Sequence, residues 1–260
     1  MDLAHLESTV DRFGTRPALT VSSGALIASL RHGLIVSCQA EDDDPFNHPE
    51  RIALIARAVE MGGAIAIRAR EAENIRSIRQ AVSIPIIGLT KGQYPDGRVL
   101  ITPDFPDVEA IVRAGANIVA VDATSRRRPN GLTGGQFTAA VKERWKCLVV
   151  ADISTFDEAL EATKVGADFV ATTLSGYTGG SPLHRDPDWN LLASLTRALS
   201  APVILEGRVW TPRQARHALD LGAFAVVVGT AITRPRIITR AFVEGMKSPQ
   251  RTSRAQTETL

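Results

Sequence analysis

The chain has 260 residues, of which 44% are hydrophobic and 22% are charged, and its formal net charge at pH 7 is +2. This length suits one domain of barrel size with a large core, and the small charge argues against a nucleic-acid or anionic-membrane partner. No apolar run approaches membrane-spanning length, no secretory leader is visible, and Cys38 and Cys147 both lie in apolar runs. We therefore expect a cytoplasmic protein with free thiols.

Short apolar runs alternate with helical segments along the chain. Strands are predicted over residues 34–39, 64–68, 85–89, 118–124, 147–152, 169–173, 203–205 and 224–228. Helices are predicted over residues 49–61, 71–81, 107–114, 133–145, 155–166, 188–199, 211–221 and 236–246. A weak helix over residues 23–32 is expected to cap the floor of a barrel, and a small extra strand is expected at 99–102. Residues 1–22 and 247–260 are expected to be mobile extensions.

One phrase, a helix end that leads into a buried strand, recurs four times, as GGAIAI, AGANIVAV, VGADFVAT and LGAFAVVV. Recurrent strand–helix units with right-handed crossovers give a parallel sheet, and eight of them usually close into a barrel. We predict a single (β/α)8 TIM barrel over residues 23–246. An open doubly wound sheet is the alternative, disfavoured by the strand count and by the lack of a G-x-G-x-x-G motif after the first strand.

The last two predicted strands end in Gly207 and Gly229, where a ligand can approach the backbone. The amides of Gly229 and Thr230, with the N-terminus of a short helix, form an anion site where TIM barrels bind phosphate, after strands seven and eight. Arg234 lies just beyond and is a planar donor suited to phosphate or carboxylate. The basic run Arg126 to Arg128 reads more as a solvated loop or a subunit contact than as a phosphate contact.

Polar residues stand at or just past the ends of the predicted strands. They are Gln39, Arg68, Lys91, Asp122, Asp152, Thr172, Thr173 and Glu206. Because the strands of a barrel end on one face, these side chains are expected to converge there. Each one alone is as easily a solvated strand end or an ion pair, but the set favours a site. No histidine ends a strand or pairs with a carboxylate at ligand spacing, so no metal is expected.

Lys91 and Glu206 are the candidates for proton transfer. Burial would lower the pKa of the lysine towards neutrality and would raise the pKa of the carboxyl, so that either could act as acid or base. The structural alternatives are a surface lysine on a long loop, and an ion pair of Glu206 with Arg208 or with Lys91 itself.

These residues lie in motifs that resemble the bacterial N-acetylmannosamine-6-phosphate 2-epimerases. In chain order the motifs are GLIVSCQA (33–40), AIRA (66–69), PIIGLTKGQY (85–94), VDATSRRRPNG (121–131), VADIST (150–155), TTLSGYT (172–178), LEGRVWTP (205–212) and VVGTAITRP (227–235). The resemblance implies cofactor-independent interconversion of N-acetylmannosamine 6-phosphate and N-acetylglucosamine 6-phosphate in sialic-acid or amino-sugar catabolism. It also implies that Lys91 and Glu206 are catalytic. The substrate contacts that it implies are Gln39, Arg68, Asp152 and Arg234, with phosphate at the Gly229 turn.

The chemistry agrees with this resemblance. Inverting a carbon next to a carbonyl requires one proton to leave and another to arrive on the opposite face, so that an acid and a base suffice without a metal. Our hypothesis is that Lys91 takes the C2 proton and that Glu206 completes the relay. Two rival functions stay open: a Schiff-base aldolase with Lys91 as nucleophile, and a phosphosugar-binding protein without activity. The expected partner is the phosphosugar, and a homodimer is one association state that the sequence allows.

Overall fold

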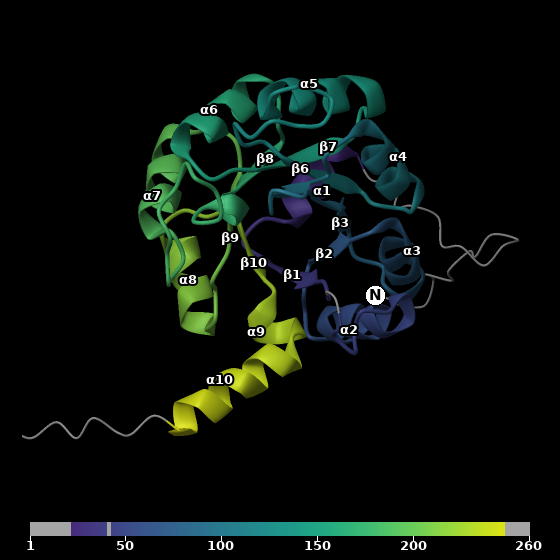
Figure 1. Ribbon diagram of the computed structural model, residues 1–260, viewed down its shortest axis with the longest axis vertical. Helices are drawn as coiled ribbons and strands as arrows, with labels where there is room; N and C mark the ends of the chain where they lie inside the picture. Colours follow the sequence, from purple (N-terminus) through teal and green to yellow (C-terminus); the bar gives the residue numbers. More distant parts are fainter. Residues whose placement is uncertain (1–21, 41–42, 248–260) are drawn as a thin grey trace, which may run out of the picture.

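A computed structural model describes residues 22–40 and 43–247 of the chain. Eight parallel strands close into a barrel in the order β1-β10-β9-β8-β7-β6-β3-β2 (Figure 1). Their bounds are β1 Leu34–Cys38, β2 Ala66–Arg70, β3 Ile86–Leu89, β6 Ile118–Asp122, β7 Leu148–Asp152, β8 Phe169–Ala171, β9 Val203–Glu206 and β10 Ala225–Val228. The predicted TIM barrel is confirmed.

Helices follow the strands and surround the barrel. They are α2 Pro49–Met61, α3 Ala72–Ala81, α4 Phe105–Arg113, α5 Gly134–Trp145, α6 Phe156–Lys164, α7 Trp189–Ala198 and α8 Pro212–Asp220, and the short α9 Thr230–Thr233 leads into α10 Pro235–Lys247. Capping boxes begin α5, α6 and α8 at the three threonines that the sequence indicates, Thr133, Thr155 and Thr211. Figure 1 shows that α10 runs away from the barrel.

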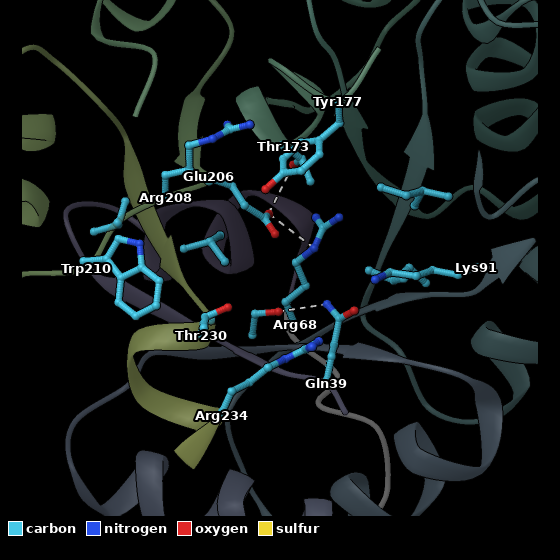
Figure 2. A pocket seen from close by; sticks show the side chains of 17 residues that line it. Gln39, Arg68, Lys91, Thr173, Tyr177, Glu206, Arg208, Trp210, Thr230 and Arg234 are labelled. Carbon is cyan, nitrogen blue, oxygen red and sulfur yellow. Dashed lines mark hydrogen bonds and ion pairs between the residues drawn. The ribbon is translucent and has the colours of Figure 1, made fainter. Parts of the chain in front are cut away.

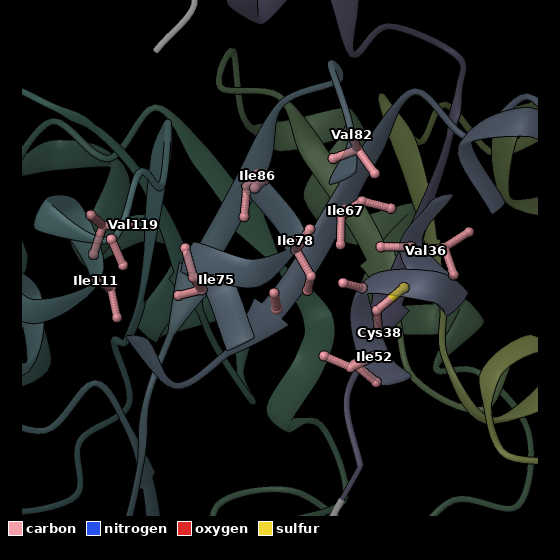
Figure 3. Packing of buried hydrophobic residues seen from close by; sticks show 14 of the residues in the cluster. Val36, Cys38, Ile52, Ile67, Ile75, Ile78, Val82, Ile86, Ile111 and Val119 are labelled. Carbon is pink, nitrogen blue, oxygen red and sulfur yellow. The ribbon is translucent and has the colours of Figure 1, made fainter. Parts of the chain in front are cut away.

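Alternation along each strand divides the core into an inner and an outer layer. In β1, Ile35 belongs to the cluster that fills the barrel, whereas its neighbour Val36 belongs to the cluster beneath the helices. Figure 3 shows part of this outer layer, in which Ile52 of α2 and Ile75 of α3 pack beside the strands. The barrel is therefore filled with side chains and is not a pore.

The helix α1 (Ser23–Ser29) closes the amino-terminal end of the barrel, as predicted. Leu26 and Leu30 pack in the same cluster as Phe169 and Phe224, and the backbone N–H of His32 donates to the carbonyl oxygen of Phe224 at 2.6 Å. With this end filled, the carboxyl ends of the strands form the face that is left for a site.

Some predicted element bounds are wrong, for local reasons. The strand β2 begins at Ala66 rather than 64, because the amide of Ala64 still closes the end of α2 by donating to Val59. The predicted strand 169–173 ends at Ala171, and Thr172–Leu174 form a 3₁₀ turn, η1. The helix α4 begins two residues early, at Phe105, because Asp104 caps it.

The connection after β3 holds the predicted extra strand, β5 (Val99–Ile101). This strand pairs with β4 (Lys91–Gln93) in an antiparallel hairpin, which the sequence did not indicate, so Lys91 belongs to the hairpin and not to a loop. The extensions expected to be mobile, 1–22 and 247–260, lie outside the described residues, except for Ser22, which caps α1, and Lys247, which ends α10.

Candidate active site

A cavity of about 290 Å³ opens at the carboxyl ends of the barrel strands (Figure 2). It is lined by eight of the residues predicted for the site: Gln39, Arg68, Lys91, Glu206, Gly207, Gly229, Thr230 and Arg234. They come from five segments that are far apart in the sequence, so the barrel brings them together. The ninth predicted residue, Asp152, does not line the cavity.

Arg68 lies between two carboxylates from different strands. It is only 1% exposed, its Nη2 lies 2.6 Å from Oδ2 of Asp152, and its Nε lies 3.3 Å from Oε2 of Glu206. Asp152 is completely buried, and its partner in the site is the guanidinium of Arg68, so the substrate contact expected of it stays a prediction. Such a charge trio is held only where the groups pair with one another.

Burial dominates the electrostatics of the two carboxyls. Burial and, to a smaller extent, the nearby charge of Asp152 raise the pKa of Glu206 to about 7, against the opposing effect of Arg68. Burial also raises the pKa of Asp152, again opposed by Arg68. Glu206 can therefore gain or lose a proton close to neutral pH, which is the range that a general acid or base requires.

The turn η1 holds Glu206 through two neighbouring hydroxyls. Thr172 Oγ1 accepts the backbone N–H of Glu206 at 3.1 Å and donates to its carbonyl oxygen at 3.0 Å. Thr173 Oγ1 lies 2.5 Å from Oδ1 of Asp152 and 3.2 Å from Oε2 of Glu206. The sequence placed both threonines at the strand ends, and the structure adds that they hold the end of β9.

Lys91 reaches the cavity from the β4–β5 hairpin, on the other side of Arg68 from Glu206 (Figure 2). Its backbone N–H donates to Oε1 of Glu71 at 3.3 Å. The base of the hairpin is fixed by Thr102, whose N–H donates to the carbonyl oxygen of Thr90 at 2.9 Å and whose hydroxyl donates to that of Ala120 at 2.7 Å. The barrel thus fixes the start of the hairpin that carries the lysine.

The basic run after β6 is not a solvated loop throughout, contrary to the prediction. Arg128 is 5% exposed, lies over the ring of Phe137 at 3.9 Å, and donates to the carbonyl oxygens of Thr102 and Pro103 at 2.9 and 3.0 Å. It therefore braces the hairpin from outside the barrel. The charge pattern gave no sign of this, because a buried arginine and an exposed one look alike in sequence.

The glycines at the other side of the cavity have the backbone geometry that the motif suggested. Gly207 has a φ of +117°, which side chains rarely adopt, and a Cβ at Gly229 would lie 3.2 Å from that of Ser37. Thr230 begins α9 at the cavity wall and Arg234 follows its end. The first amides of a helix and an arginine are suitable partners for a phosphate.

Sequence reasoning did not assign three further lining residues to the site. Tyr177, Arg208 and Trp210 line the cavity, and the guanidinium of Arg208 lies 4.4 Å from the ring centroid of Tyr177. Arg208 also donates to the carbonyl oxygen of Ser175 at 2.9 Å. The partner that the structure gives Glu206 is Arg68, and Arg208 instead packs on Tyr177. The available signal was position, since all three follow β8 or β9 closely.

Across residues 22–40 and 43–247 no three or more His, Cys, Asp or Glu side chains gather in a group suited to a metal ion. The donor set at the cavity is instead cationic and hydrogen-bonding, with Lys91, Arg68, Arg208 and Arg234 around one carboxylate. Such a set fits an anionic, hydroxyl-rich molecule and an acid–base step.

Comparisons with known proteins agree with one another. The model of the NanE family, described as "Putative N-acetylmannosamine-6-phosphate epimerase", matches residues 52–248. A relative from Caldanaerobacter subterraneus subsp. tengcongensis, named "Putative N-acetylmannosamine-6-phosphate 2-epimerase", is 51% identical over 223 residues, which cover 85% of this chain and 94% of the relative. A relative of the same name from Cutibacterium acnes is 43% identical over 224 residues, with 85% and 97% covered.

A comparison with solved structures agrees with these relatives. The N-acetylmannosamine-6-phosphate 2-epimerase from Clostridium perfringens is 39% identical, has a TM-score of 0.82, and the match covers 88% of this chain and 99% of that one. A thiamine phosphate pyrophosphorylase from Pyrococcus furiosus, at 19% identity and a TM-score of 0.56, shares the fold alone.

Proposed function

The chain belongs to the N-acetylmannosamine-6-phosphate epimerase family, and from this premise we propose that it interconverts N-acetylmannosamine 6-phosphate and N-acetylglucosamine 6-phosphate by proton transfer at C2. The observation that carries the mechanism is the opposed placement of Lys91 and Glu206 in one cavity. No cofactor takes part in the proposed reaction.

In the open-chain sugar, the aldehyde acidifies the hydrogen at C2. A base removes this hydrogen as a proton, an enolate forms, and an acid returns a proton to the opposite face of C2. Figure 2 shows Lys91 and Glu206 on different sides of Arg68, which supports a mechanism in which one group serves each face of C2. We assign proton removal from N-acetylmannosamine 6-phosphate to Lys91. In the reverse direction the roles exchange.

Arg68 contributes a fixed positive charge beside the acid. Its Nε lies 3.3 Å from Oε2 of Glu206, so it offsets the negative charge that remains when Glu206 gives up its proton. Asp152 orients this guanidinium with a 2.6 Å contact. This pair acts on the reaction through Glu206, and the guanidinium also offers a donor to the sugar at the cavity floor.

The phosphate of the substrate is proposed to bind at Gly207, Gly229, Thr230 and Arg234, opposite the hairpin. Binding there is remote from C2, and it supplies the energy that holds a flexible open chain between acid and base. Gln39, whose Nε2 donates to Oγ of Ser37 at 2.8 Å, contacts the sugar between the two ends of the cavity.

Proton NMR of N-acetylmannosamine 6-phosphate in heavy water tests the proposal. We expect the gluco epimer to appear with deuterium at C2. Lys91→Ala and Glu206→Gln are expected to lose at least a hundredfold in turnover while still binding the sugar phosphate. The matched controls are Lys164→Ala and Glu143→Gln, which change exposed helix residues of the same types.

The outcome of this experiment also separates the rival functions. If no epimer and no exchange appear, the epimerase proposal is refuted. Treatment with borohydride in the presence of substrate would then trap a covalent adduct on Lys91 of an aldolase, whereas binding without any chemistry would indicate a phosphosugar-binding protein.

We further propose that the reaction serves sialic-acid or amino-sugar catabolism in the cytoplasm. None of the helices in the described part of the chain has both the length and the apolar character needed to cross a membrane. Fractionation of cells that express the full chain tests the location, and the proposal fails if the activity sediments with membranes.

We also propose that two copies associate through α10. This helix has no buried residue, and Phe242, Val243 and Met246 are 70%, 43% and 85% exposed on it. A contiguous apolar helix face of this kind is typical of a protein interface. Light scattering after gel filtration should give the mass of a dimer. Phe242→Glu should give a monomer and Leu54→Glu, 70% exposed on α2, should not; a monomeric wild type would contradict the proposal.

A further inference from the structure

The charges at the floor of the site do not balance by themselves. One guanidinium, Arg68, faces two carboxylates, Asp152 and Glu206, whose side chains are 0% and 12% exposed. If both carboxylates are charged, the buried trio carries a net negative charge, and water reaches it only at Glu206. Two ionised carboxylates in this position repel each other, and this repulsion raises the pKa of both. A group that reduces the repulsion is therefore needed to keep the titration of Glu206 at neutral pH.

Thr173 is the group that touches both carboxylates. Its Oγ1 lies 2.5 Å from Oδ1 of Asp152 and 3.2 Å from Oε2 of Glu206. A hydroxyl has one proton, which it donates to either acid, and two lone pairs, which can accept the proton of a neutral acid. When one acid is ionised and the other is protonated, the hydroxyl satisfies both contacts at once; when both are ionised, its single proton bonds to one carboxylate at a time.

The neighbouring residue, Thr172, holds the backbone at this point, so Thr173 is not needed for that purpose. Thr172 binds the backbone N–H and the carbonyl oxygen of Glu206 and so fixes the end of β9. Because Thr172 already holds the backbone, the contacts of Thr173 concern only the carboxylates. The turn η1 thus uses one hydroxyl for the strand and one for the charges.

We propose that Thr173 is a positioning residue of the epimerase reaction, whose hydroxyl bridges Asp152 and Glu206 and thereby keeps Glu206 able to exchange its proton at neutral pH. The inference rests on the proposed function for its consequence in turnover, but its effect on Glu206 can be measured without turnover.

The direction of the effect follows from the surroundings of Glu206. The charged groups that act on it are Arg68 of β2 and Lys91 of β4, which favour its charged form, and Asp152 of β7, which opposes it. Asp152 in turn feels the charge of Asp122 on β6. The hydrogen bond that Thr173 Oγ1 donates to Oε2 of Glu206 also favours the charged form of Glu206, so the loss of this bond raises the pKa of Glu206.

The test compares Thr173→Val, which removes the hydroxyl at nearly constant volume, with Thr173→Ser, which keeps it. Carbon-13 NMR of labelled glutamate carboxyls, with the signal assigned from Glu206→Gln, follows the titration of Glu206 directly. We expect the midpoint to rise by about one pH unit in Thr173→Val and to return to the wild-type value in Thr173→Ser. In the pH profile of kcat/KM, the limb that reports the ionisation of Glu206 should shift by the same amount.

Thr163→Val is the matched control, because the Thr163 hydroxyl donates only to Ala159 within α6, far from the cavity. If Thr173→Val does not fold, Thr173→Ala provides the same loss of the hydroxyl. An unchanged or lowered midpoint in the variant without the hydroxyl overturns the inference. A shifted midpoint in a protein that does not epimerise supports the effect of Thr173 on the titration of Glu206 and refutes the proposed function instead.

Discussion

Replacement of Arg68 by methionine tests the charge trio at the floor of the cavity most severely. The substitution roughly keeps the volume of the aliphatic stem and removes the guanidinium, which leaves Asp152 buried without its cation. Breaking a buried ion pair in this way costs about 3–5 kcal/mol. For a chain of this size each kcal/mol lowers Tm by roughly 2–4 °C, so we expect Tm to fall by about 6–20 °C.

The assay is thermal or urea unfolding at pH 7.5, with an exposed pair as the control. Arg216 and Asp220 lie 2.7 Å apart, much like Arg68 and Asp152, but their side chains are 75% and 50% exposed. Arg216→Met should therefore cost less than about 0.5 kcal/mol. Adding Asp152→Asn to Arg68→Met should restore part of the loss, because the uncompensated charge is then gone. A Tm for Arg68→Met within about 2 °C of the wild type would refute the reasoning.

Three further predictions follow from single residues. The pKa of Glu206, about 7, lies above its value in the unfolded chain, so the folded state binds a proton more tightly. The free energy of unfolding of the wild type should therefore fall between pH 5 and 8 by about 2–3 kcal/mol relative to that of Glu206→Gln, as measured by urea unfolding. Free energies of unfolding that change equally with pH in the two proteins would contradict this. Gly134→Ala should cost about 1–3 kcal/mol, since its Cβ would lie 2.4 Å from the carbonyl carbon of Ala123, whereas Gly24→Ala, in open space on α1, should be neutral or stabilising; equal urea midpoints would refute this. Arg234→Met should lower kcat/KM for the phosphosugar about 10- to 100-fold, and an unchanged value would exclude a phosphate contact.

The fold was largely predictable because its signals are local and repeated. A helix end followed by a buried strand recurs in the sequence, and capping residues such as Thr133 and Thr155 mark helix starts. Errors arose where a tertiary contact overrode the local pattern. Thr172 and Thr173 have the β-branched side chains of a strand, but their hydroxyls bond to Glu206 and Asp152, and the chain turns there.

The sequence indicated most of the residues that line the cavity, but it did not indicate how deep each side chain lies. The rule that barrel strands end on one face was sufficient to gather Gln39, Arg68 and Glu206. It does not say which strand-end residues reach the cavity, and Asp152 lies beneath Arg68 instead. Depth along a strand is set by the stagger of the whole barrel, which no segment of sequence reveals by itself.

The hairpin β4–β5 has a consequence for how such an enzyme changes over time. Lys91 stands on this appendage, whereas Glu206 ends a strand of the closed barrel. Substitutions or insertions at the hairpin tip, residues 94–98, leave the barrel core untouched. Glu206 is thus part of the closed barrel, whereas Lys91 stands at the fixed base of a hairpin whose tip lies outside the barrel. A descendant enzyme could acquire a new substrate by remodelling the hairpin alone, while it inherits its acid unchanged.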